Sequence, residues 1–352
     1  MLLNKENELR RKVGDFNSLY GIKSYVLDEG KARGVKAYDL NNGQGLNATI
    51  FADRGLDIPF LSYKGVNISL LTKSGISSPF SYTESGLYGF MRQFNAGFLT
   101  TCGVTYSGSP SVNADGYVLG LHGPYSNTIA ENVTAYRDYA EDGEAILHVN
   151  GEVRQSMMFR ENVRVYRKLA MHTESNIIEL HDVIENQGFE TQPLMMVYHC
   201  NFGYPMLDAG AKCYFTAHDV KPLSPFAEEG MHKRDVVEEP EDGRDEQCYL
   251  HSGAEDDACF GMIHNPALGL AVAIHYNQKQ CPFMVHWKMM GSGNYGLGLE
   301  PTVCTTGGQQ EAMNNGYLPY LKPGEKYAID VTFEVITDPE RIQYLIDKSS
   351  ER

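Results

Sequence analysis

The feature that most restricts the fold of this chain is a series of segments in which apolar residues alternate with polar or small ones. The alternation has a period of two, the spacing of side chains on one face of a β-strand. The clearest segments are 145–149, 163–169, 178–184, 270–276 and 327–335. Turn-forming clusters such as Glu141-Asp142-Gly143 and Lys322-Pro323-Gly324 lie between them. The pattern therefore predicts a protein of half-buried strands.

Helical periodicity is confined mainly to the chain ends, where Asp338 is placed to cap a helix that begins at Pro339. Regularly spaced strands with few helices favour an all-β fold, a large antiparallel β-sandwich, over alternating strands and helices. The acidic stretch 228–257 is interpreted as a long surface excursion, because it contains few apolar residues. We therefore expect a single domain over residues 1–352.

Charge and cysteine usage exclude several classes of partner. The net charge of −15 repels phosphate backbones and anionic lipids, so nucleic acid and membrane surfaces are not expected partners. The seven cysteines are scattered without a C-x-x-C pair, which argues against a disulfide framework and a cysteine zinc site. No signal peptide or membrane span is recognised, so a cytoplasmic location is expected. The oligomeric state is not indicated.

Two histidines and one glutamate in glycine-bearing settings are the candidate catalytic residues. His122 lies between Gly120-Leu121 and Gly123-Pro124, His199 follows the apolar run 193–198, and Glu300 ends an otherwise uncharged stretch. An acid and a base of different pKa allow a proton to be removed at one atom and returned at another. Each residue has an ordinary alternative: a loop histidine, a core histidine bonded to a carbonyl, and an exposed glutamate in a turn.

Five residues are candidates for binding substrate: Arg54, Arg92, Asn201, Trp287 and Lys288. Arginine offers a fixed fork of donors to vicinal hydroxyls or a carboxylate, so an acidic sugar is one possible ligand. Asn201 lies two residues after His199, on the same face of the expected strand. The alternatives are an internal salt bridge for Arg54, a surface charge for Arg92 and a core position for Trp287.

Two further motifs are set aside. The stretch 291–296 matches G-x-G-x-x-G, but a strand-like run and not a helix follows it, so no dinucleotide site is expected. Eleven histidines raise the question of a metal, yet none forms H-x-H or H-E-x-x-H. A metal held by His122, His199 and Glu300 is ranked below acid–base use, and no cofactor is expected.

Taken in order, five segments resemble the DUF4432-like branch of the aldose 1-epimerase (galactose mutarotase-like) superfamily, over roughly residues 50 to 335. They are 53–58, 97–103, 120–123, 198–205 and 298–301. The resemblance implies a supersandwich of strands with the ligand on one concave sheet face. It also implies that His122 matches one active-site histidine, His199 the acid and Glu300 the base, while Arg54 stands near the position of a substrate-binding arginine. Pro124 replaces a glycine of the mutarotase motif, and Tyr198 replaces an asparagine.

The resulting hypothesis is a mutarotase that binds a small carbohydrate and opens its ring reversibly. Glu300 takes the proton of the anomeric hydroxyl, His199 protonates the ring oxygen and His122 donates a hydrogen bond to the developing charge. One alternative is a metal-assisted carbon epimerase or isomerase of a sugar. The other is a carbohydrate-binding protein without catalysis.

Overall fold

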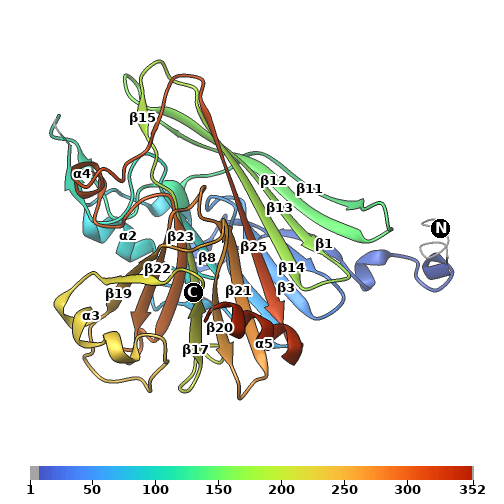
Figure 1. Cartoon of the computed structure of the whole chain (residues 1–352). Coiled ribbons are helices and arrows are strands. Elements are labelled where there is room, and N and C mark those ends of the chain that lie inside the picture. The colour runs from blue at the N-terminus through green and yellow to red at the C-terminus, as the bar shows by residue number, and fades with distance from the viewer. Residues whose placement is uncertain (1–7, 114, 351–352) are drawn as a thin grey trace.

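The computed structural model describes residues 8–113 and 115–350, and two large antiparallel sheets form the body of the fold (Figure 1). Buried side chains from both sheets form one continuous hydrophobic core between them. The all-β sandwich predicted from the alternating segments is therefore confirmed. Each of the five clearest segments lies within a strand of the second sheet described below.

The first sheet has eleven strands among the described residues. In spatial order they are β1 (Gly21–Val26), β2 (Lys36–Asn41), β3 (Leu46–Phe51), β4 (Asp57–Tyr63), β8 (Leu99–Cys102), β16 (Val197–Phe202), β23 (Gly296–Thr302), β22 (Phe283–Met289), β19 (Gln247–Ser252) and β18 (Asp219–Pro222), with β5 (Val66–Asn67) paired to β4.

The second sheet has eight described strands. In spatial order they are β11 (Glu131–Tyr139), β12 (Ala145–Ser156), β13 (Asn162–His172), β14 (Ile177–Asn186), β25 (Lys326–Ile336), β21 (Leu270–Asn277), β20 (Ala258–Asn265) and β17 (Lys212–Phe215). Three short pairs complete the strands: β6 (Leu70–Leu71) with β7 (Ala96–Gly97), β9 (Ser111–Val112) with β10 (Val118–Leu119), and β15 (Gln192–Pro193) with β24 (Tyr320–Leu321).

The helices named in the described part of the chain are short. They are α2 (Leu87–Gln93), α3 (Pro225–Glu229), α4 (Gln309–Asn314) and α5 (Pro339–Lys348), with single 3₁₀ turns η1 (Phe16–Ser18), η2 (Gly30–Ala32), η3 (Pro79–Ser81), η4 (Tyr125–Asn127) and η5 (Met231–Lys233). Helix α5 begins as predicted, because the Asp338 side chain accepts a hydrogen bond from the Glu340 backbone N–H. It packs Ile342 and Leu345 on β20 and β21 (Figure 1).

The acidic stretch 228–257 is more than the surface excursion expected from its composition. It contains η5 and then β19, which pairs with β22 inside the first sheet. The strand is short, and the acidic residues on both sides of it make the whole stretch poor in apolar residues, so composition alone does not indicate it. Its position matters because β19 forms part of the cavity wall described below.

A buried polar network joins the two sheets across the core. Arg167 on β13 donates to both carboxylate oxygens of Asp182 on β14, at 2.9 and 2.7 Å, and to Asp57 Oδ1 on β4 at 3.0 Å. The hydroxyl of Tyr198 on β16 donates to Asp182 at 2.8 Å. Buried charges of this kind are tolerated only when they are paired and hydrogen-bonded. The network therefore fixes β4 and β16 of the first sheet against the second.

All seven cysteines lie in the described residues, and each is free. Among the described helices, none combines the length and apolar character that a bilayer crossing requires.

Candidate active site

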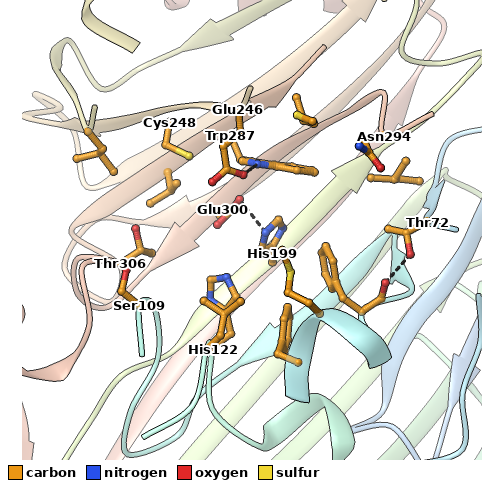
Figure 2. A pocket seen from close by; sticks show the side chains of 18 of the residues that line it. Thr72, Ser109, His122, His199, Glu246, Cys248, Trp287, Asn294, Glu300 and Thr306 are labelled. Carbon is orange, nitrogen blue, oxygen red and sulfur yellow. Dashed lines mark hydrogen bonds and ion pairs between the residues drawn. The ribbon is translucent and has the colours of Figure 1, made fainter. Parts of the chain in front are cut away.

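His199 and Glu300 are brought together by two neighbouring central strands of the first sheet. Strands β16 and β23 pair antiparallel, with Cys200 opposite Leu299. Alternation sends Tyr198 and Cys200 into the core, so His199 and Glu300 project from the other face of the sheet. His199 Nε2 lies 3.2 Å from Glu300 Oε1 (Figure 2).

Gly298 supplies the space that this pair occupies. It lies two residues before Glu300 on β23, and therefore on the same face of the sheet. A Cβ at this position would sit 2.5 Å from Glu300 Oε1 and 3.2 Å from His199 Cε1. Only glycine leaves both side chains undisturbed.

His122 approaches the pair from a tight turn, as its flanking glycines predicted. Its φ is +59°, and Gly123 follows with φ +72°. A Cβ on Gly123 would lie 2.4 Å from the Tyr106 carbonyl oxygen and 2.5 Å from that of Gly103, so the close approach requires glycine. The imidazole of His122 lies 5.8 Å from that of His199 between ring centroids, nearly edge to face.

Aromatic side chains enclose the two imidazoles. Phe90 on α2 lies 4.9 Å from His122, and Phe94, which follows α2, lies 5.4 Å from His199. The indole of Trp287 on β22 stands 5.6 Å from His199, nearly edge to face. Its N–H donates to Glu246 Oε2 at 2.7 Å, which fixes the plane of the ring. These contacts hold the imidazoles in a largely apolar setting.

Burial sets the electrostatics of the three candidate catalytic groups. It raises the pKa of Glu300 well above its ordinary value, and the Glu246 carboxylate acts in the same direction. It lowers the pKa of His199 well below its ordinary value, with a further contribution from His122. Burial also lowers the pKa of His122 to about 4, so this imidazole is neutral near pH 7. In all three groups the low dielectric disfavours the charged form.

Several polar atoms of the three groups have no hydrogen-bond partner among the described residues. They are Glu300 Oε1, His199 Nδ1 and His122 Nδ1. The 3.2 Å approach of His199 to Glu300 is therefore close without being a well-aligned hydrogen bond. Buried polar atoms are normally paired, and clusters of exceptions are a frequent property of functional sites.

The three side chains line a large cavity on the outer face of the first sheet. Its volume is about 1930 Å³, compared with about 300–1,000 Å³ for most small-molecule sites. Its charged lining residues are five acids and two lysines: Asp219, Asp245, Glu246, Glu300, Glu311, Lys73 and Lys221. No arginine is among the described residues that line it.

Four of the five residues suggested as substrate ligands lie outside the cavity lining, which corrects their assignment as direct ligands. Arg54 is 3% exposed and donates to the carbonyls of Ser77 and Gln93 at 2.9 and 3.0 Å. Gln93 ends α2, so Arg54 supports the helix that carries Phe90. Arg92 also belongs to α2, but it is exposed and does not line the cavity.

The other two corrections concern Lys288 and Asn201. Lys288 follows Trp287 on β22 and so points to the opposite face, where it donates to the Lys233 and Val236 carbonyls and to Glu238. Asn201 is fully buried beside His199 and donates to the His199 carbonyl at 2.8 Å. Trp287 alone of the five lines the cavity.

Sequence reasoning missed the residues that complete the cavity around this centre. Glu246 was treated as one of many acids in the stretch 228–257. Phe90 and Phe94 are apolar, so nothing in their local sequence marks them as parts of a site. The strand that Glu246 precedes, Gln247–Ser252, is buried at four of its six residues and so lacks the alternation that would have indicated it. Among the described residues, His122, His199 and Glu300 do not form a group that could hold a metal ion.

Comparison with known proteins identifies the family. Residues 32–335 match the family model described as domain of unknown function DUF4432. A search of curated proteins finds none similar in sequence.

Solved structures show the same fold at low identity. One is a provisionally assigned aldose 1-epimerase from Klebsiella pneumoniae, 23% identical over 97% of this chain and 90% of that one, with a TM-score of 0.88. Others are a galactose mutarotase-like protein from Clostridium acetobutylicum (13%; 91% and 99% covered; TM-score 0.63) and galactose 1-epimerase from Lactobacillus acidophilus (12%; 90% and 99% covered; TM-score 0.59). The fold is that of the galactose mutarotase-like sandwich, and the chain belongs to the DUF4432 family.

Proposed function

We propose that this protein is a mutarotase, an isomerase that interconverts the anomers of a carbohydrate by reversible ring opening. The observation that carries the proposal is the buried pair His199–Glu300, 3.2 Å apart at the base of a sugar-sized or larger cavity. The anomeric oxygen and the ring oxygen of an aldose are bonded to the same carbon. An acid and a base only a few ångströms apart can therefore serve both oxygens.

The pair holds one proton between its two members when it acts. In the proposed step the Glu300 carboxylate accepts the proton of the anomeric hydroxyl, while the His199 imidazolium donates to the ring oxygen. The C1–ring oxygen bond breaks, the carbonyl forms at C1, and both protein groups become neutral. The directions of both pKa shifts show that burial favours this uncharged form, which is therefore the resting state of the pair. The ion pair that starts the step holds the same single proton and is the less populated form. Rotation about C1–C2 and the reverse proton transfers give the other anomer.

His122 and Trp287 support the step without exchanging a proton with the pair. His122, neutral near pH 7, is close enough to His199 to donate an N–H to an oxygen that gains charge. The fixed indole of Trp287 offers an apolar edge against which a sugar ring can pack.

The test is Glu300→Gln, which keeps the size of the side chain and removes its basicity. We expect anomer exchange, followed by exchange NMR or polarimetry across a sugar panel, to fall by roughly 10²–10⁴-fold with the fold intact by circular dichroism. Phe189→Ala, at a 97% exposed residue outside the cavity, is the matched control and should leave the rate unchanged.

Two results would contradict the proposal in different ways. Deuterium incorporated from solvent at a sugar carbon would indicate a carbon epimerase, because ring opening leaves every C–H bond intact. Saturable sugar binding with no acceleration by the wild-type protein would indicate a binding protein.

A further inference from the structure

The cavity continues well beyond the catalytic pair. Figure 2 shows Thr72 and Asn294 on one side of His199, and Ser109 and Thr306 on the other. Its volume of about 1930 Å³ exceeds the usual range for small-molecule sites, so one sugar ring at His199 and Glu300 leaves much of it unfilled.

The side that contains Asn294 has a distinct composition, and we call it the aromatic end. It is defined by Phe60, Leu71, Tyr204, Asn294 and Tyr295, all of which line the cavity. Tyr204 is 67% exposed, Leu71 49% and Phe60 38%, which is unusual for large apolar side chains gathered along one hollow.

Backbone and side-chain hydrogen bonds hold this end in a fixed shape. The Gly203 N–H donates to the Ile68 carbonyl at 3.0 Å, and Asn67 Nδ2 donates to the Tyr204 carbonyl at 2.8 Å. Just before β23, the neighbour of β16, the Tyr295 hydroxyl donates to the Glu238 carbonyl at 2.6 Å. The aromatic rings are therefore presented by rigid backbone, as preorganised binding requires.

Its distance from the catalytic pair fits a neighbouring sugar ring. Tyr204 lies five residues after His199, and at about 3.3 Å per residue this places it at most about 17 Å along the chain. Strands β16 and β23 stay paired as far as Phe202 and Leu297, which lie between the catalytic pair and the aromatic end. Tyr204 therefore lies within the reach of a second ring linked to the one at the catalytic pair.

The charge of the cavity restricts what the second group can be. Five acids against two exposed lysines, with no described arginine on the walls, disfavour a phosphate or carboxylate. Aromatic faces beside an exposed amide, Asn294, suit a group with apolar faces and hydroxyl edges, which is the character of an uncharged sugar ring.

We infer that the aromatic end is a second sugar subsite, and that the preferred substrate is a neutral reducing oligosaccharide. This inference rests on the proposed function, since the ring at His199 and Glu300 must carry a free anomeric hydroxyl. The ring linked to it packs on Tyr204 and Phe60 and hydrogen-bonds to Asn294. Sugar acids and sugar phosphates are poorer substrates, contrary to the acidic sugar that Arg54 and Arg92 had suggested.

The experiment compares exchange NMR rates for a neutral reducing disaccharide, the monosaccharide at its reducing end, and the 6-phosphate of that monosaccharide. A panel of disaccharides with different linkages is used. We expect at least one to exceed its monosaccharide about tenfold in kcat/KM, equivalent to about 1.4 kcal/mol. Tyr204→Ala and Phe60→Ala should remove this advantage and leave the monosaccharide rate unchanged, while Tyr204→Phe should retain it.

Tyr317→Ala is the matched control, since Tyr317 is a 47% exposed ring that lines the same cavity and lies outside the aromatic end. Equal constants for all disaccharides and monosaccharides would overturn the inference, as would loss of the advantage in Tyr317→Ala and not in Tyr204→Ala. If no sugar is accelerated, the proposed function fails by itself. Disaccharide binding to the wild type and to Tyr204→Ala, measured by saturation-transfer NMR, then tests the second subsite without relying on catalysis. Weaker binding to Tyr204→Ala would support the subsite, and equal binding would contradict it.

Discussion

Replacing Gly298 by alanine should disable the site without removing any of its chemical groups. The added Cβ would lie 2.5 Å from Glu300 Oε1, and ordinary contact begins near 3.4 Å, so the carboxylate must withdraw by about 0.9 Å. Misplacement of a reacting group by about 1 Å can cost roughly 10²-fold in rate, which corresponds to about 2.7 kcal/mol in the barrier. We therefore expect kcat for anomer exchange to fall roughly 10²-fold.

Stability should change little in the same variant, and this separates a catalytic effect from a folding effect. Alanine in a strand gains roughly 0.5–1 kcal/mol over glycine, while crowding of a core costs roughly 1–3 kcal/mol. The clashing atom is the end of a flexible side chain, so the net change in the free energy of unfolding should stay within about 1 kcal/mol by urea denaturation.

The matched control for Gly298→Ala is Gly261→Ala on β20. Gly261 belongs to the second sheet, and neither it nor Met284 lines the cavity. A Cβ at Gly261 would lie 3.0 Å from the end of the Met284 side chain. It should leave kcat unchanged. Wild-type turnover in Gly298→Ala would show that the position of Glu300 does not limit the reaction, and would refute the reasoning.

Burial and charge lead to three further predictions. First, kcat should not fall between about pH 6 and 8. The pKa of His199 is lowered and that of Glu300 is raised, so the pair keeps its single proton across neutrality. A fall in kcat with an apparent pKa near 6.5 would contradict this prediction. Second, Glu246→Gln removes a charge that raises the pKa of Glu300, so the alkaline limb of the pH–kcat profile should move to lower pH. An unchanged alkaline limb would show that Glu246 does not influence the titration of Glu300. Third, Arg167→Ala leaves Asp182 buried without its cationic partner and should cost about 3–5 kcal/mol in urea denaturation, whereas a loss below about 1 kcal/mol would contradict the role given to the network.

The sandwich could be predicted from the sequence because its longest strands each have one buried face. In β13 and β14 nearly every second residue is buried, which is the pattern that alternation predicts. Strand β16 is different, because all six of its residues are buried. A strand covered on both faces loses its alternation, so His199 was expected at the end of an apolar run, although it lies within the strand.

The convergence of His199 with Glu300 could be suspected from their settings and from the family resemblance, but local sequence alone could not establish it. It depends on the pairing of β16 with β23, whose residues are about 100 positions apart in the chain. Local sequence does not specify which strands pair or in what register. The error at Lys288 was avoidable, because neighbours on a strand face opposite ways and only one of Trp287 and Lys288 could face the ligand.

Arg54 shows a different limit of sequence reasoning. A donor fork that suits a sugar suits main-chain carbonyls equally well, and here it binds those of Ser77 and Gln93. Whether an arginine faces a ligand or the protein depends on the packing of α2, which the sequence does not reveal. Such a residue affects the site through the helix it supports.

The two faces of β16 connect the stability of this fold to its site. On the core face, the Tyr198 hydroxyl is held by Asp182, which Arg167 holds in turn. On the other face, His199 stands next to Tyr198 in the chain and projects into the cavity. Because adjacent residues of a strand share one backbone, a network that fixes Tyr198 also limits the movement of His199. The cost of burying three charged side chains in the core is thus incurred where a displacement of about 1 Å would matter most, directly beneath the acid–base pair.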